Sequence, residues 1–251
     1  MSAPAVLPRG EGGFTGMAWG VLLATLAAYA AVPGTAFQYD DFRVVVVDND
    51  VHSWAGWWAA MPGMRPLTKA SYVANWIVSP EPAGFAIAGV AIHAASSLLV
   101  LALARRWLAA FAPALPRPGF AALATALVFA LHPAQTEAVA YIAGRSTALS
   151  TMFTLAALLA WERARDGSPA AWRAATMLLF VAAMGARESA WTLPFALVLV
   201  EVARGERMRE ALKLTLPFWG LALVLAALVL AIAPYRQLLA TSLSIRPPLD
   251  N

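Results

Sequence analysis

The 251-residue sequence is 61% hydrophobic and 13% charged, with a mean hydropathy of +0.66. Soluble domains carry about twice this share of charged residues, so the composition excludes an ordinary soluble fold and indicates an integral membrane protein. The net charge of +4 does not predict a nucleic-acid partner, because the basic residues are dispersed among apolar runs. The absence of cysteine excludes disulfides and thiolate metal sites.

The chain opens with residues 1–13, which are small, polar and glycine-rich and predict a disordered cytoplasmic tail. An uncharged run from about Gly16 to Pro33 follows, close to the ~20 residues that cross a bilayer. This run predicts a first span that is retained. Because Ala28-Tyr29-Ala30 resembles a signal-peptidase site, a cleaved signal peptide is the alternative.

The segment 35–81 differs from the rest of the chain, since it is acidic, rich in tryptophan and interrupted by proline. Asp40 and Asp41 lie near its start, and Trp54, Trp57 and Trp58 follow. Tryptophans beside spans favour the membrane–water interface. We therefore predict a long first loop that carries short interfacial helices.

Apolar runs after this loop predict an all-α, polytopic membrane protein with about seven transmembrane helices. The membrane domain is expected over residues 14–234, followed by an exoplasmic tail at 235–251. The six runs after the first span cover about residues 83–104, 119–131, 146–161, 169–186, 189–203 and 214–234.

Lys and Arg are unevenly divided between the two sides of these spans. Eleven lie on the side of Arg105 and Arg106, and seven lie on the other side. Because basic loops remain in the cytoplasm, the first side is predicted to be cytoplasmic. The loop at 35–81, the stretch 131–146 and the pair Arg187-Glu188 then lie on the exoplasmic face, where we expect them to form one site.

The stretch 131–146 places polar side chains between two apolar runs. Pro133 is a favoured first-turn residue, so a helix is predicted to start there. In such a helix Glu137, Tyr141 and Arg145 are four residues apart and share one face. A polar stripe on an apolar helix needs polar partners. The alternative is a helix end at which Arg145 extends to the interface and Glu137 faces water.

These clusters suit a particular chemistry. The adjacent carboxylates of Asp40 and Asp41 could supply a general base for a hydroxyl group, or hold a divalent cation. Arginines on the same face suit a phosphate, because the guanidinium fork matches its oxygens. A base, a phosphate clamp and a membrane setting together suggest group transfer from a lipid phosphate carrier.

Several motifs also occur in a characteristic order. They are Tyr39-Asp40-Asp41, Arg65-Pro66-Leu67-Thr68, a small-residue span with His93, Leu131-His132-Pro133-Ala134-Gln135-Thr136-Glu137-Ala138-Val139, Gly144-Arg145-Ser146 and Ala186-Arg187-Glu188. Over about residues 14–204 the sequence resembles the membrane part of the transmembrane and tetratricopeptide-repeat protein O-mannosyltransferases, within the C-type glycosyltransferase superfamily. The His-Pro-x-x-Thr-Glu-Ala-Val string with its following Gly-Arg is the most specific part.

The resemblance implies an enzyme that uses a polyprenyl- or dolichyl-phosphate sugar, commonly mannose. The sugar passes to a Ser or Thr hydroxyl of an acceptor protein on the exoplasmic side. The acidic motif of the family maps onto Asp40 and Asp41, one of which is expected to be the base. No cofactor beyond the donor is expected, with a divalent cation as the alternative.

The donor phosphate is expected to lie among the polar residues of the other motifs. Arg65, Arg145 and Arg187 are candidate ligands for it, and Glu137 and Glu188 are expected to orient them. His132 and Tyr141 complete the predicted wall of the donor site. These roles follow from charge and predicted topology within the resemblance.

Two features depart from the family. Its members usually carry Lys before Glu at the position of Arg187. They also continue into further spans and a repeat region that this chain lacks. We therefore expect residues 235–251 to be the truncated start of further family sequence, or a partner chain to supply the missing spans. The membrane is expected to be the bacterial inner membrane or the endoplasmic reticulum.

Two other functions remain open from the sequence. A transporter or lipid flippase could use His93, His132, Glu137 and Arg145 as a proton or anion path. His93 on an apolar helix is nevertheless expected to be packed and hydrogen-bonded. The chain could also be a non-catalytic membrane subunit of the same fold, although it retains both Asp40 and Asp41.

Overall fold

The structure is a computed structural model that describes residues 11–61, 63–233, 235–237 and 240–241, and within these ranges it holds helices and turns but no strand. The predicted all-α class is confirmed. The predicted tails at 1–13 and 235–251 lie largely outside the described residues, although helix α1 already begins at Glu11. The elements are α1 (Glu11–Ala28), η1 (Val32–Gly34), η2 (Phe42–Val46), η3 (Asn49–Val51), α2 (Trp54–Ala59), α3 (Pro66–Val78), α4 (Pro82–Phe111), α5 (Pro118–Leu131), η4 (Pro133–Gln135), α6 (Thr136–Ala140), η5 (Ile142–Gly144), α7 (Arg145–Arg163), α8 (Pro169–Ala186), η6 (Glu188–Thr192), α9 (Leu193–Ala203) and α10 (Met208–Ala231).

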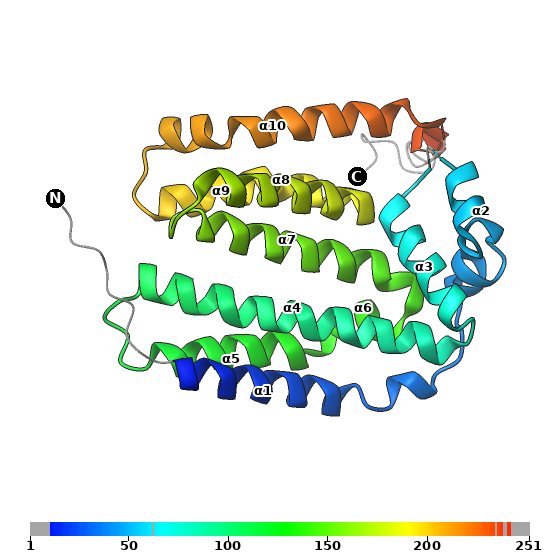
Figure 1. The fold of residues 1–251 in the computed structure, drawn as a ribbon, viewed down its shortest axis with the longest axis horizontal. Helices are drawn as coiled ribbons and strands as arrows, with labels where there is room; N and C mark the ends of the chain where they lie inside the picture. Colours follow the sequence, from blue (N-terminus) through cyan, green and yellow to red (C-terminus); the bar gives the residue numbers. More distant parts are fainter. Residues whose placement is uncertain (1–10, 62, 234, 238–239, 242–251) are drawn as a thin grey trace, which may run out of the picture.

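The long helices lie side by side with similar axis directions, from α1 at one edge to α10 at the other (Figure 1). Within the described residues, five are long and apolar enough to cross a membrane. A sixth span results if α5 and the helical segment 133–140, bent by 49° at His132, count as one. The five are Gly13–Gly34, Pro82–Phe111, Ile142–Arg163, Pro169–Ala186 and Met208–Ala231.

The predicted span at 189–203 is divided in the structure. Its first residues form the short helix η6, and α9 is only 11 residues long. A helix of this length rises about 17 Å, less than the roughly 30 Å of a hydrocarbon core. Helix α9 therefore lacks the length to cross a membrane by itself.

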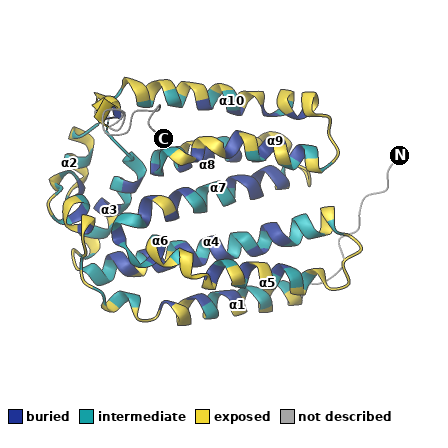
Figure 2. Ribbon diagram, turned by 180° about the vertical axis from the view of Figure 1, so that it is seen from behind, coloured by how far each residue is buried: buried dark blue, intermediate teal, exposed yellow. Residues whose placement is uncertain are grey.

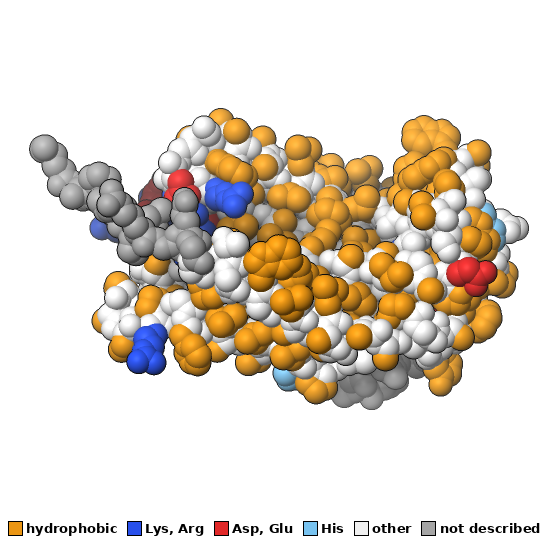
Figure 3. Space-filling view, turned by 60° about the horizontal axis from the view of Figure 1, so that its bottom comes forward, with side chains coloured by type: hydrophobic (Ala, Val, Ile, Leu, Met, Phe, Trp, Pro, Cys, Tyr) orange, Lys and Arg blue, Asp and Glu red, His pale blue; other side chains and the backbone are white. Residues whose placement is uncertain are grey.

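The outer faces of the long helices are apolar. On α10, Leu216 and Leu223 are 65% and 72% exposed, and Leu178 on α8 is 71% exposed. Buried residues concentrate on the inner faces of α4 and α7 (Figure 2). One face of the molecule is mainly hydrophobic between its two ends (Figure 3). Such a surface suits lipid, which is the expected surrounding of a multi-pass membrane protein.

Four apolar clusters of buried residues occur in the described part of the chain, and the three largest hold the bundle together. Phe180, Leu193 and Phe218 anchor the cluster between α7, α8, α9 and α10. Val21 and Leu101 lie in the cluster that joins α1, α4 and α5. The third cluster fixes the first loop on the bundle and consists of Val45, Val51, Tyr72, Val73, Phe85 and Ile142.

The prediction of one continuous helix from Pro133 is wrong. The chain bends at Tyr141, which has extended backbone angles (φ −89°, ψ 116°), and η4, α6, η5 and α7 follow one another instead. Two side chains from the first loop explain the break. Asp41 accepts the Ala143 N–H at 2.7 Å, and Tyr72 donates to the Ile142 carbonyl at 2.9 Å. A continuous helix would pair both groups internally.

Candidate functional site

The first loop, the α5–α7 connection and the α8–η6 turn meet at the end of the bundle where α2 and α3 lie (Figure 1). Direct contacts join them: Asp41 to Ala143, Arg187 to Ser146, and Arg65 to Glu188. The three polar clusters expected to converge therefore do lie together. We call this end the site end.

Asp41 is the anchor of the acidic pair. It is only 1% exposed, and its two oxygens accept the N–H groups of Gln38 at 3.0 Å and Ala143 at 2.7 Å. Burial raises the pKa of the Asp41 carboxyl above its ordinary value, although these N–H groups oppose the shift. Both oxygens are thus occupied: one closes a turn within the loop at Gln38, and the other holds the loop to the bundle at Ala143.

Asp40 faces the opposite way. Its side chain is 61% exposed, and its one ion pair among the described residues is a 3.6 Å contact with the exposed Arg43. The Asp40 N–H donates to the Tyr141 hydroxyl at 3.0 Å. Tyr39 before it has a left-handed backbone (φ 43°), a conformation that costs a non-glycine residue free energy. The turn therefore presents the Asp40 carboxylate outward on a fixed backbone.

Glycines allow the α6 segment to pack closely. A Cβ on Gly144 would lie 2.5 Å from the Glu137 carbonyl oxygen, and a Cβ on Gly89 of α4 would lie 2.7 Å from that of Val139. Neither distance is accessible to a side chain. The glycine of the Gly144-Arg145-Ser146 motif therefore allows α7 to begin directly against α6.

Arg145 does not face open surface. It is 2% exposed, and its guanidinium donates to the Ser71 carbonyl at 3.3 Å, the Asn75 side chain at 2.7 Å and the Phe85 carbonyl at 2.8 Å. The rings of Tyr72 and Phe85 lie 4.9 and 5.2 Å from it. The charge holds α3, α4 and α7 together, and no surface is left for a phosphate.

Arg65 and Glu188 form a partly exposed pair. The Arg65 Nε lies 3.1 and 3.2 Å from the two Glu188 oxygens, and Nη2 adds a contact of 3.2 Å. The Tyr235 hydroxyl donates to Glu188 at 2.6 Å and accepts the Arg65 N–H at 3.2 Å. Burial alone would raise the pKa of Glu188, but the hydrogen bonds from Arg65 and Tyr235 hold it below its ordinary value.

Arg187 differs from both of these arginines. It donates to the Ser146 hydroxyl at 3.1 Å and the Thr147 hydroxyl at 2.9 Å, at the start of α7. Within the part of the chain that the structure describes, it forms no ion pair with a carboxylate. Its positive charge is therefore not neutralised by a neighbouring acid.

The remaining predicted residues have smaller structural roles. His132 is exposed, and its Nδ1 accepts the Ala134 N–H at 3.1 Å, which caps η4. Glu137 is exposed on α6 and pairs with none of the three arginines. His93 lies inside the bundle, where its Nε2 donates to the Ala130 carbonyl at 2.9 Å. The expectation of a packed, hydrogen-bonded His93 is confirmed.

The acidic residues that follow the acidic pair are engaged in the loop itself. Lys69 contacts Asp48 at 2.9 Å and Asp50 at 3.1 Å. Burial tends to lower the pKa of Lys69, but its hydrogen bonds to the two carboxylates raise it overall. This small network ties η3 to α3 and leaves Asp40 as the exposed carboxylate of the acidic pair.

Sequence reasoning did not single out Tyr235, Tyr72, Asn75 or Thr147. Tyr235 falls in the predicted tail, yet it is buried and bonded to Glu188. Asn75 and Tyr72 lie three residues apart on α3, a spacing that places both on one helix face. That polar face was the available signal for a partner of Arg145.

The fold and the site end define a class: a multi-pass helical membrane protein with a polar site at one end of its bundle. No family model matches the chain, and no solved structure matches it significantly. The curated relatives that it matches are protein O-mannosyl-transferases. It is 28% identical to Tmtc2 of Drosophila melanogaster over 200 residues (70% of this chain, 20% of the relative) and 29% identical to Tmtc1 of the same species over 199 residues (73% and 21%). It is also 30% identical to TMTC2 of Mus musculus over 152 residues (54% and 17%).

These relatives confirm the resemblance that the motifs indicated. The chain spans about a fifth of the length of the curated relatives it matches. The similarity therefore concerns one part of those proteins, and their activity comes to this chain only as a proposal.

Proposed function

We propose that this chain is a glycosyltransferase that moves mannose from a polyprenyl- or dolichyl-phosphate carrier to a protein Ser or Thr hydroxyl on the exoplasmic face. The observation that carries the proposal is the division of roles within the acidic pair. Asp41 fixes the loop on the bundle, and Asp40 presents an exposed carboxylate beside the α6–η5 turn. The names of the relatives support the reaction class.

Asp40 is assigned as the general base. The acceptor hydroxyl attacks the anomeric carbon of the sugar, its proton passes to the Asp40 carboxylate, and the bond from that carbon to the carrier phosphate breaks. A base must come within hydrogen-bonding reach of the proton that it takes. Asp40 meets this requirement with its 61% exposed side chain, and Asp41, at 1% exposed, does not.

Arg187 is assigned to the carrier phosphate, which keeps the electrons of the broken bond and gains negative charge. The Arg187 guanidinium is held by two hydroxyls and not by a carboxylate, so an incoming phosphate meets no competing acid at this residue. Arg65 is already paired with Glu188 through Nε and Nη2, so its charge is largely neutralised there. Arg145 is assigned to the fold and not to the donor.

The test is transfer of labelled mannose from a polyprenyl-phosphate donor to endogenous membrane protein. Membranes with the unmodified chain are compared with Asp40→Asn and Asp41→Asn variants at equal amounts of folded protein. We expect Asp40→Asn to lower the transfer rate by about 100-fold or more, the usual contribution of a general base. Full transfer by Asp40→Asn would remove this residue from the reaction, and absence of transfer by the unmodified chain would reject the proposal.

A further inference from the structure

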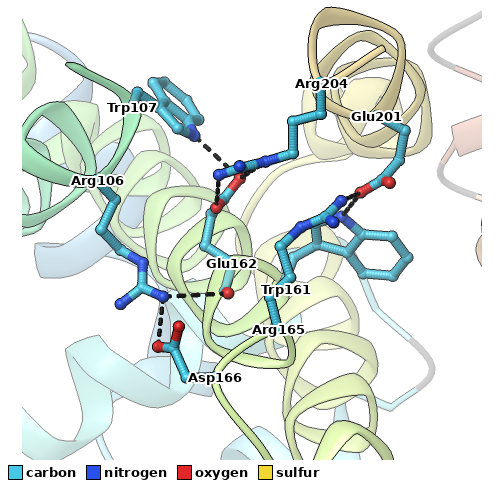
Figure 4. A network of polar contacts seen from close by, with 8 residues as sticks. All are labelled: Arg106, Trp107, Trp161, Glu162, Arg165, Asp166, Glu201 and Arg204. Carbon is cyan, nitrogen blue, oxygen red and sulfur yellow. Dashed lines mark hydrogen bonds and ion pairs between the residues drawn. The ribbon is translucent and has the colours of Figure 1, made fainter. Parts of the chain in front are cut away.

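The opposite end of the bundle carries a second polar network, on residues that the proposed function does not use (Figure 4). Its centre consists of two glutamates, Glu162 near the end of α7 and Glu201 near the end of α9, each only 1% exposed. Both lie in the last turn of a helix, where the helix dipole disfavours a negative charge. Burial and the dipole together mean that each carboxylate needs strong partners.

The partners come from other helices. Arg204, which follows α9, donates to both oxygens of Glu162 on α7, with an Nε distance of 3.3 Å to Oε1. Arg165, which follows α7, donates to Glu201 on α9. Each helix thus supplies one glutamate, and the segment that follows each helix supplies an arginine that reaches the glutamate of the other helix (Figure 4).

A tryptophan completes each pair. The Trp107 indole N–H on α4 donates to Glu162 at 3.2 Å, and the Trp161 indole N–H on α7 donates to Glu201 at 2.7 Å. Arg106, beside Trp107, donates to the Glu162 carbonyl at 3.2 Å and pairs with Asp166. The network therefore holds the ends of α4, α7 and α9 in one place.

The sequence spacing makes the exchange informative. Glu162 and Arg165 are three residues apart, and so are Glu201 and Arg204. Residues three apart are neighbours on a helix, so the spacing by itself favours pairing of each glutamate with the arginine that follows it in the sequence. The structure shows the crossed arrangement instead, which exists only when α7 and α9 have one particular register.

We propose that these four residues, the Glu–Arg clasp, lock the register of α7 against α9. The lock has a consequence for the other end of the same helices. Ser146 and Thr147 lie in the first turn of α7, and η6, which leads into α9, starts directly after Arg187. The clasp therefore fixes the far ends of the two segments whose near ends bring Arg187 to the Ser146 hydroxyl. This inference is independent of the proposed function.

The test exchanges charges without changing the net charge or the composition of the protein. One variant is Glu162→Arg with Arg165→Glu, the second is Glu201→Arg with Arg204→Glu, and the third combines all four substitutions. Local pairs, Glu162 with Arg165 and Glu201 with Arg204, would survive every exchange, because both partners change sign together. The crossed clasp survives only the combined one, because either single-helix exchange places Arg opposite Arg and Glu opposite Glu.

We expect each single-helix exchange to lower the Tm of the purified protein in detergent by about 6 °C or more. The fourfold variant should regain at least half of this loss. It should not regain all of it, since the two indole N–H groups then face arginines. Single-helix exchanges that leave Tm unchanged, or a fourfold variant that loses as much as both exchanges added together, would overturn the clasp.

A second measurement covers the case in which a single-helix exchange fails to fold. The chain has no cysteine, so engineered thiols are unambiguous. Arg165→Cys with Glu201→Cys should be joined by a short bifunctional thiol reagent in native membranes. Arg163→Cys with Glu201→Cys is the matched control, because Arg163 stacks on Trp172 instead, at 5.2 Å. Equal cross-linking of the two pairs would contradict the crossed geometry.

Discussion

The two ends of the bundle stabilise buried charge in different ways. At the end that carries the Glu–Arg clasp, the buried carboxylates of Glu162 and Glu201 pair with arginines, so opposite charges neutralise each other. At the site end, Arg145 is held by carbonyl and amide oxygens, and Asp41 is held by backbone N–H groups. Because those buried charges use neutral partners, Asp40 and Arg187 are not drawn into strong internal pairs. The Asp40 carboxylate and the Arg187 guanidinium thus stay available for the ligands that the proposed function assigns to them.

The largest effect is expected from removing the buried charge at the site end. Arg145→Met should lower the free energy of unfolding by about 3–5 kcal/mol, because the oxygens that it satisfies lose their partner in a buried place. The free energy of unfolding of Arg145→Lys should lie between those of the unmodified protein and Arg145→Met, since an ammonium keeps the charge but cannot copy the planar fork. Unfolding in detergent measures both. A stable Arg145→Met protein would mean that the neutral oxygens do not need the charge.

The close approach at Gly144 sharpens the same comparison, because it positions the turn that Asp41 holds. Gly144→Ala should lower the free energy of unfolding by about 1–3 kcal/mol. The added Cβ would lie 2.5 Å from the Glu137 carbonyl oxygen, which is backbone and cannot move freely. Gly20→Ala on α1 is the matched control. It meets nothing within 4 Å and should be neutral or stabilising by up to about 1 kcal/mol. Equal effects in thermal unfolding would show that the close approach is not required.

The two aspartates should separate stability from reactivity. Asp41→Asn should lose about 1–3 kcal/mol, because its amide group must face a buried N–H that the carboxylate accepted. Asp40→Asn should change the free energy of unfolding by less than about 0.5 kcal/mol, as expected for an exposed residue with one weak ion pair. Denaturation of both proteins provides the measurement. The reverse order of stabilities would exchange the roles of anchor and base.

The smallest effect concerns the Arg65–Glu188 pair and depends on pH. Its carboxyl has a folded-state pKa below the ordinary value of 4.5, so the stability that it contributes is full above that value and is lost as the pH falls through the folded-state pKa. The Tm difference between the unmodified protein and Glu188→Gln should therefore be constant from about pH 7 to pH 5 and shrink below about pH 4.5. A difference that grows on acidification has the opposite sign and would contradict the pairing.

Much of the architecture could be predicted from the sequence because it follows from composition. Uncharged runs near bilayer length give the long helices, and alternation across the membrane places the first loop, residues 131–146 and Arg187-Glu188 at one end. The short α9 was harder to recognise. Its apolar run is continuous with η6, and only the backbone shows where the helix begins.

The details of the site could not be predicted in the same way. The break at Tyr141 depends on Asp41 and Tyr72, which lie 102 and 70 residues from their backbone partners. The burial of Arg145 depends on Asn75 and Phe85 in the same manner. A helical pattern contains only local spacing, so it predicted a polar stripe where long-range contacts had divided the helix.

The proposed function assigns Arg187 as the cation at the site end that binds an anionic donor. Binding of a labelled polyprenyl-phosphate sugar to Arg187→Gln tests it most directly, with Arg209→Gln at the opposite end as the matched control. Loss of one charge-assisted contact should weaken donor binding by about 10-fold or more, while the control binds as the unmodified protein does. Equal binding by the two variants would show that Arg187 does not contact the donor.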